Sequence, residues 1–204
     1  MLRLMGIALL ACAAILFTHK GGARQTGDAA AGHQAASTAS PSAPDSAPVP
    51  NPISSTVKGQ LARFGKNMVA AAESMPAEKY NFKPTADMNS FGHLLIHIAQ
   101  SNNGLCGKIS GTDAPETKLA ETDGKEKLVA ALKASFDFCG TALANVDDSK
   151  LGAPLTLFGN RPSSRGAALV ILSDGWNDHY GAQAIYLRLN GILPPTAQPQ
   201  PAKQ

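Results

Sequence analysis

The sequence DHYGAQAIYLRLNG, residues 178–191, identifies the fold because it continues an apolar spacing that begins earlier in the chain. Apolar or aromatic side chains recur every three or four residues through this region, at Leu169, Leu172, Trp176, Tyr180 and Leu187. This period is that of one face of an α-helix. Gly191 and the two prolines soon after it are typical of the end of a helix. We therefore predict a helix over about 163–190.

Three earlier segments have the same period, over 54–75, 90–111 and 128–146. Ser90 is a good N-cap residue for the second of them. The residues before the last helix contain an apolar fragment, 155–158, followed by the turn signal Gly159–Asn160, which predicts a loop or a short hairpin-like excursion. Four amphipathic helices of about twenty residues, joined by medium connections, predict an all-α four-helix bundle.

The charge of the chain is small. Its 204 residues include 18 Lys and Arg and 15 Asp and Glu, for a formal net charge of +3. The basic residues are spread along the chain without a run of five or six, so charge gives no support for nucleic-acid binding. We expect a small molecule, of a class that the sequence does not identify, as the ligand.

Residues 1–23 have the layout of an export signal, with one early arginine, an apolar stretch over 4–18 and then small and basic residues. The stretch is short for a membrane span, which needs ~20 apolar residues. Cleavage after Ala23 would release the protein, whereas the lipobox-like string that ends at Cys12 would attach a lipid. Because the apolar run continues past Cys12, we expect simple export to the periplasm rather than a lipid or membrane anchor. The membrane is then contacted only through this segment.

The next segment, 24–52, is rich in Ala, Ser and Pro and has no apolar periodicity, which predicts a disordered linker. The bundle is expected over 53–197, and 198–204 is a flexible tail. His19 and His33 precede the bundle and are excluded as site residues.

Two of the three cysteines, Cys106 and Cys139, fall within the predicted helices. In an oxidising compartment they would form a disulfide. Both also lie on apolar helix faces, where free cysteine is a common small hydrophobic residue. The sequence leaves both alternatives open.

The helical wheel, at ~100° per residue, separates the histidines of the bundle. His179 lies about 60° from the apolar centre of the last helix, so it faces inward or nearly so. In the second helix His97 lies about 120° from the apolar centre, on its flank, and His93 lies almost opposite that centre. His93 and His97 have the i, i+4 spacing at which two imidazoles share a divalent ion. A single histidine on a helix is more often a packed structural residue, and Asp174 and Asp178 are expected in solvent.

The strings SFGHLLIHIAQSNNGLC, residues 90–106, and DHYGAQAIYLRLNGILPP, residues 178–195, resemble the DinB-like superfamily of four-helix bundles, which includes thiol-dependent transferases. The resemblance covers 53–197. It implies a divalent metal ion, often zinc or nickel, held by one histidine of the second helix and two at H-x-x-x-H in the last. It also implies hydrolase or thiol-transferase chemistry at that ion.

Carried over by position, the resemblance gives His97 and His179 as metal ligands and places the third on Gly175, which has no side chain. His93 or a water molecule would then complete the site. The alternative is an exported binding or stress-related bundle whose metal site has degenerated and which catalyses nothing. Arg188 is either an anion-binding residue or a charge that stabilises the helix end. The apolar helix faces would allow a homodimer.

Overall fold

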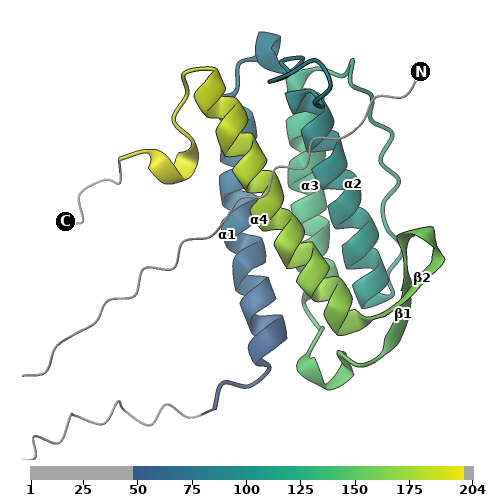
Figure 1. The fold of residues 1–204 in the computed structure, drawn as a ribbon. Coiled ribbons are helices and arrows are strands. Elements are labelled where there is room, and N and C mark those ends of the chain that lie inside the picture. The colour runs from purple at the N-terminus through teal and green to yellow at the C-terminus, as the bar shows by residue number, and fades with distance from the viewer. Residues whose placement is uncertain (1–47, 200–204) are drawn as a thin grey trace, which may run out of the picture. The chain divides into compact units, whose positions relative to one another are not determined.

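The computed structural model describes residues 48–199. The predicted export signal with Cys12, nearly all of the predicted linker and most of the predicted tail lie outside the described residues. Four long helices make up most of the described part, with a two-stranded hairpin before the last of them (Figure 1). The helices are α1 (Pro52–Ser74), α2 (Phe91–Ser110), α3 (Lys125–Leu143) and α4 (Arg165–Leu189), and the strands are β1 (Pro154–Leu157) and β2 (Arg161–Ser164).

The ends of α2 and α4 follow the capping signals in the sequence. Ser90 Oγ accepts a hydrogen bond from the His93 amide at 3.0 Å, and Gly111 ends the helix with φ 78°. At the start of α4, Ser164 Oγ accepts from the Ala167 amide at 3.2 Å. A hydroxyl at the N-cap satisfies one of the amides that lack a partner within the helix, and glycine adopts positive φ without strain. The prediction of four helices and a hairpin-like excursion is confirmed.

The third helix was predicted to reach residue 146, but α3 ends at Leu143. Val146 is nevertheless buried, because the turn after α3 packs against the core. Its apolar side chain therefore extends the apparent helical period beyond the helix itself.

The first amides of α1 are satisfied by a residue far away in the sequence. The Asp148 carboxylate accepts hydrogen bonds from the amides of Ile53 and Ser54 at 2.9 and 2.8 Å. Asn51 occupies the N-cap position with φ 51° and makes no side-chain cap. The helix begins two residues before the predicted start because this distant carboxylate supplies the cap.

Contacts between the helices fix their directions. Asn102 of α2 bonds to Ser135 of α3, and a disulfide joins Cys106 to Cys139, so α2 and α3 run parallel. Gln183 of α4 donates to the Met68 carbonyl of α1, and Ser173 bonds to Gln60, so α1 and α4 are also parallel. The connection 111–124 returns along the bundle to the start of α2 (Figure 1).

The disulfide resolves the alternative that the sequence left open. Cys106 and Cys139 are both completely buried and form a bond between α2 and α3. They belong to a core built from the apolar faces of all four helices, in which Trp176 contacts the rings of Phe64 and Phe136. The bond therefore ties together two neighbouring helices within the core.

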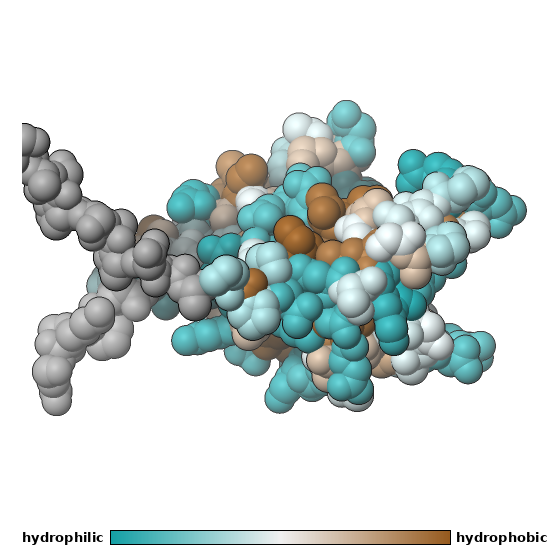
Figure 2. All heavy atoms as spheres, turned by 90° about the horizontal axis from the view of Figure 1, so that it is seen from below, coloured by the Kyte–Doolittle hydropathy of each residue, from teal (hydrophilic) through white to brown (hydrophobic). Residues whose placement is uncertain are grey.

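The surface at one end of the bundle is mixed in polarity. Seen from the end that is lowest in Figure 1, apolar atoms show in patches between hydrophilic ones (Figure 2). None of the helices in the described part is long and apolar enough to cross a membrane.

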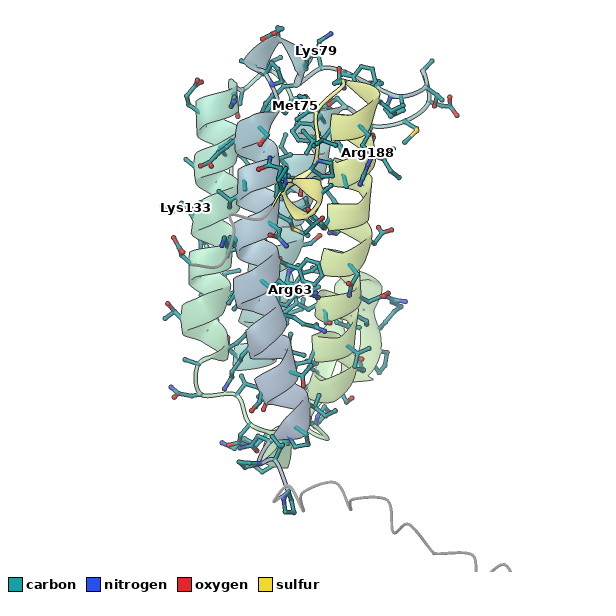
Figure 3. All side chains as sticks on the ribbon, turned by 90° about the vertical axis from the view of Figure 1, so that its left-hand side faces the viewer. Arg63, Met75, Lys79, Lys133 and Arg188 are labelled. Carbon is teal, nitrogen blue, oxygen red and sulfur yellow. A yellow bond between two sulfur atoms is a disulfide. The ribbon has the colours of Figure 1, made fainter. Side chains whose placement is uncertain are left out.

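Figure 3 shows α1 between α3 and α4, with Lys133 and Arg188 on its two neighbours. The exposed side chains of Val170, Ile185 and Leu189 on α4 are compatible with the predicted homodimer, which stays a prediction.

Candidate functional site

A pocket of about 220 Å³ lies between α2, α4 and the hairpin. Its polar lining comes from two histidines, an arginine, a serine and an asparagine, and the rest is apolar. The lining residues are His97, Ser101, Asn102 and Leu105 of α2, Leu157, Phe158 and Arg161 of the hairpin, and Ile171, Leu172, Gly175, Trp176 and His179 of α4.

His97 and His179 meet across this pocket. Their ring centroids are 4.9 Å apart and the ring planes are at 88° to each other. Two imidazoles that bind one zinc ion at ~2.1 Å have centroids roughly 5 Å apart. Within residues 48–199, neither ring forms a hydrogen bond to another protein group. The separation therefore suits a shared ion, and the ring nitrogens are not used by other protein contacts.

The surroundings of His179 favour its neutral form. Burial lowers the pKa of the His179 imidazole, and the neighbouring His97 lowers it further, although Asp178 opposes these effects. Only the neutral imidazole has a free electron pair for a metal ion, and the lowered pKa of His179 favours that form at neutral pH. His97 is exposed at the pocket surface.

A buried chain of hydrogen bonds supports the floor of the pocket. Trp176 Nε1 donates to Asn102 Oδ1 at 2.8 Å, and Asn102 Nδ2 donates to Ser135 Oγ at 3.0 Å. All three residues are almost completely buried. Because buried polar groups are costly unless paired, this chain holds α2, α3 and α4 in one relative position beneath the histidines.

Gly175 leaves room for a side chain next to His179. A Cβ atom built on Gly175 would lie 3.6 Å from His179 Cε1 and 3.9 Å from Nδ1, which are ordinary van der Waals distances. The position lines the pocket, one turn before His179. The missing third ligand therefore leaves space beside the histidine pair, rather than a position that packing has closed.

Phe158 reaches over from the hairpin and lies against Gly104 of α2. A Cβ atom at Gly104 would come within 2.7 Å of Phe158 Cζ, so the close approach depends on glycine. The turn between the strands contains Gly159 and Asn160, both with positive φ, at 68° and 56°. Glycine and asparagine tolerate this conformation, and the turn therefore places Phe158 and Arg161 on the pocket.

His93 has a different partner. Its Nδ1 lies 2.9 Å from Glu121 Oε1, and Ser90 donates to the other oxygen of the same carboxylate at 3.0 Å. These hydrogen bonds, that of His93 first, lower the pKa of Glu121. Within the described part of the chain, no three His, Cys, Asp or Glu side chains form a group that would hold a metal ion. The structure thus brings together two of the three predicted ligands, His97 and His179. His93 forms a hydrogen bond with Glu121 instead.

Sequence reasoning missed Arg161 and Phe158, which come from the hairpin. An apolar fragment with a turn signal predicted the hairpin itself, but nothing in the sequence placed it beside α2 and α4. Arg188, the predicted alternative for anion binding, does not line the pocket and bonds to the Ala184 carbonyl within α4. Asp174 and Asp178 are exposed, as predicted.

A larger and more open hollow of about 880 Å³ lies between α1 and α3. Its charged lining is mixed, with Lys58, Lys66 and Lys133 beside Glu73 and Asp137. It contains no histidine or cysteine among the described residues that line it. Of these two pockets, only the smaller one has histidines among its described lining residues.

A sequence model of the DinB superfamily matches residues 60–182, more than half of the chain. The chain belongs to the DinB superfamily. The matched span includes both histidines of the pair and Gly175. No curated protein matches the chain.

Solved structures have the same fold. A DinB-like protein from Bacillus subtilis is 20% identical with a TM-score of 0.57, and the match covers 71% of this chain and 99% of that one. A DinB-like protein from Bacillus cereus is 15% identical with a TM-score of 0.58, covering 69% and 95%. A mutant of the mycothiol-dependent maleylpyruvate isomerase is 10% identical with a TM-score of 0.52, covering 63% and 59%. At these identities the likeness concerns the fold alone.

The residues present fit a divalent ion with two protein ligands. The separation of the His97 and His179 rings suits one ion, and burial favours neutral His179. Catalytic zinc sites usually have three protein ligands, and their histidines usually donate the second ring nitrogen to a carboxylate or carbonyl. Both features are lacking in the described residues, so an ion held here would have fewer protein contacts than at a three-histidine site.

Proposed function

We propose that this DinB-superfamily protein binds a divalent metal ion, zinc or nickel, through His97 and His179. One observation carries the proposal. The ring centroids of the two imidazoles lie 4.9 Å apart at a pocket large enough for a small ligand. The DinB-like resemblance of the sequence implies ligands at these same two positions. The conclusion therefore draws on the fold, the position of the residues and the ring geometry together.

We further propose that the site serves hydrolase or thiol-transferase chemistry on a small molecule. A bound divalent ion would make a water or a thiol a stronger nucleophile near neutral pH. The chain's own residues do the rest. His97 and His179 would hold the ion, the apolar side chains of Phe158, Leu157 and Trp176 would contact the ligand, and the buried Asn102 amide keeps Trp176 in place.

Export is part of the proposal. The buried disulfide between Cys106 and Cys139 is typical of proteins in oxidising compartments, because cytosolic thiols are kept reduced. Together with the apolar segment at the start of the sequence, it favours the periplasm. A cytosolic thiol cofactor would be scarce there, which favours hydrolysis over thiol transfer.

A second candidate is a binding protein without catalytic activity, whose ancestral metal site has degenerated. Gly175 favours it, because a side chain that would complete the site is missing although the backbone leaves space for one. In that case His97 and His179 form only a polar edge of the pocket.

Metal titration of the purified full chain, without an affinity tag, separates the two candidates. Isothermal titration calorimetry with zinc and with nickel should give one ion per chain. We expect His97→Ala and His179→Ala to abolish binding, because each removes half of the protein ligands. His93→Ala is the matched control on the same helix, and we expect it to leave the affinity unchanged because His93 lies on Glu121.

Well under one ion per chain, with no response to His97→Ala, would overturn the metal proposal and leave the non-catalytic binding protein. Loss of binding in His93→Ala alone would show that the ion is held elsewhere on α2.

A further inference from the structure

Arg161 gives the pocket a third polar side chain whose chemistry differs from that of the histidines. It is the first residue of β2 and pairs with Leu157 across the hairpin. Leu157 is buried, while Arg161 is exposed and lines the pocket together with His97 and His179. Arg161 therefore lies on the solvent side of the same cavity as the two imidazoles.

The guanidinium of Arg161 has no acidic partner among the described residues. The ion pairs within residues 48–199 join His93 to Glu121, Lys118 to Glu116 and Lys127 to Asp123, and none involves Arg161. The described lining of the pocket contains no carboxylate. A cation next to an apolar wall, without a neutralising group, favours an anion as the ligand.

A second cation strengthens this preference. Lys108 Nζ lies 5.6 Å from the centroid of the Phe158 ring, which forms one wall of the pocket. Arg161 on the pocket and Lys108 behind Phe158 therefore place two cations near the hairpin, and the lining also includes the apolar side chains of Leu105, Ile171 and Trp176. A ligand that matches both has an anionic end and an apolar body.

The geometry of the arginine and the size of the cavity narrow the class further. The planar guanidinium fork matches the two oxygens of a carboxylate. At about 220 Å³ the pocket is smaller than the roughly 300–1,000 Å³ of sites for drug-sized ligands, so the ligand is compact. We propose that the pocket binds small organic carboxylates, with the carboxylate on Arg161, the apolar body against Phe158 and Trp176, and the other end toward His97 and His179.

The proposal that a carboxylate binds here depends only on Arg161 and the pocket. The proposal that this carboxylate is the substrate rests on the proposed function. The imidazole edge of the cavity would then face the part of the ligand that reacts. Arg161 acts as a specificity residue that selects and orients the carboxylate.

The only tryptophan of the chain reports on the pocket directly. The sequence contains one Trp, and Trp176 lines the cavity, so its fluorescence and its single indole N–H signal change when a ligand enters. We would titrate the metal-free full chain with benzoate and with benzamide, which has almost the same shape but no charge. Benzoate should bind at least about tenfold more tightly than benzamide, because only benzoate forms charge-assisted hydrogen bonds.

Substitutions of Arg161 complete the test. Arg161→Gln should weaken benzoate binding about tenfold or more and leave benzamide unchanged, and Arg161→Lys should fall between because it keeps the charge without the fork. Arg188→Gln is the matched control, since Arg188 is on α4 but does not line the pocket. Arg161 is exposed, so its variants should fold, and circular dichroism checks this.

Equal binding of benzoate and benzamide, or no effect of Arg161→Gln on benzoate, would overturn the inference. A repeat with zinc-loaded protein distinguishes its failure from that of the proposed function. If benzoate then binds only with zinc and depends on His97 but not on Arg161, the metal proposal stands and the carboxylate site fails. If benzoate binding depends on Arg161 while zinc does not bind, the carboxylate site stands and the metal proposal fails.

Discussion

His93 and His97 lie one turn apart on α2 but have different surroundings. His93 is next to the N-cap, where Glu121 of the returning connection and Ser90 form a polar cluster with it. His97 faces His179 above a buried layer that contains the Asn102 hydrogen bonds and the Cys106–Cys139 disulfide. Two histidines one turn apart on the same helix therefore have different roles, because each contacts a residue from a different part of the chain.

Removal of the disulfide should have the largest effect, because it removes support beneath the His97 region. The bond closes a loop with a sequence separation of 33, for which chain entropy predicts about 3 to 4 kcal/mol of stabilisation. We expect the double variant Cys106→Ala and Cys139→Ala to lose about that much free energy of unfolding in urea denaturation. The wild-type protein in reducing agent is the matched comparison. An unchanged unfolding midpoint, both in the double variant and in the reduced wild-type protein, would show that the disulfide does not stabilise the bundle.

Addition of a third histidine beside His97 and His179 should have the next largest effect. Gly175→His adds an imidazole one turn before His179, in space that a Cβ atom can occupy. Loss of even an outer partner of a metal ligand costs about 10–100-fold in affinity, so an added direct ligand should raise zinc affinity by at least about 10-fold. Calorimetry measures this, and Gly181→His is the control because Gly181 is exposed on the same helix and does not line the pocket. The same gain in both variants would show that the pair is not the site.

Removal of the partner of His93 should have the smallest effect. We expect Glu121→Gln to shift the melting temperature at pH 7 by no more than about 2 °C, because exposed ion pairs contribute little. The folded pKa of Glu121 lies below its ordinary value of 4.5, so the contact stabilises the protein above that pH and the effect is lost as pH falls through the folded pKa. The melting temperatures of variant and wild type should therefore converge as the pH falls below that value. A destabilisation as large as that of the cysteine variant would remove the contrast between the two histidines.

Zinc binding tests the same contrast at the metal. Glu121→Gln should leave the zinc affinity unchanged in calorimetry, since Glu121 contacts His93 and not the pair. A loss of affinity in this variant would show that His93 takes part in the site.

Much of the site was predictable residue by residue. The helical wheel placed His179 inward and Asp178 in solvent, and the structure agrees. The alignment of Gly175 with a missing ligand was visible in the sequence, but the free space beside it was not, because that depends on how α2 and α4 pack. The partner of His93 was not predictable, since Glu121 lies in a connection without periodicity.

The helices, the cap at Ser90, the glycine at the end of the last helix and the four-helix bundle follow from the sequence, because apolar period and capping chemistry act over a few residues. The resemblance of the sequence to the DinB-like superfamily also indicated which residues to test as metal ligands, and that stays a prediction. The DinB-like resemblance already implied that His97 and His179 lie together, whereas the bond between Cys106 and Cys139 and the place of Arg161 on the pocket became clear from the tertiary structure alone. These contacts join separate elements, whose relative positions depend on the packing of the whole core.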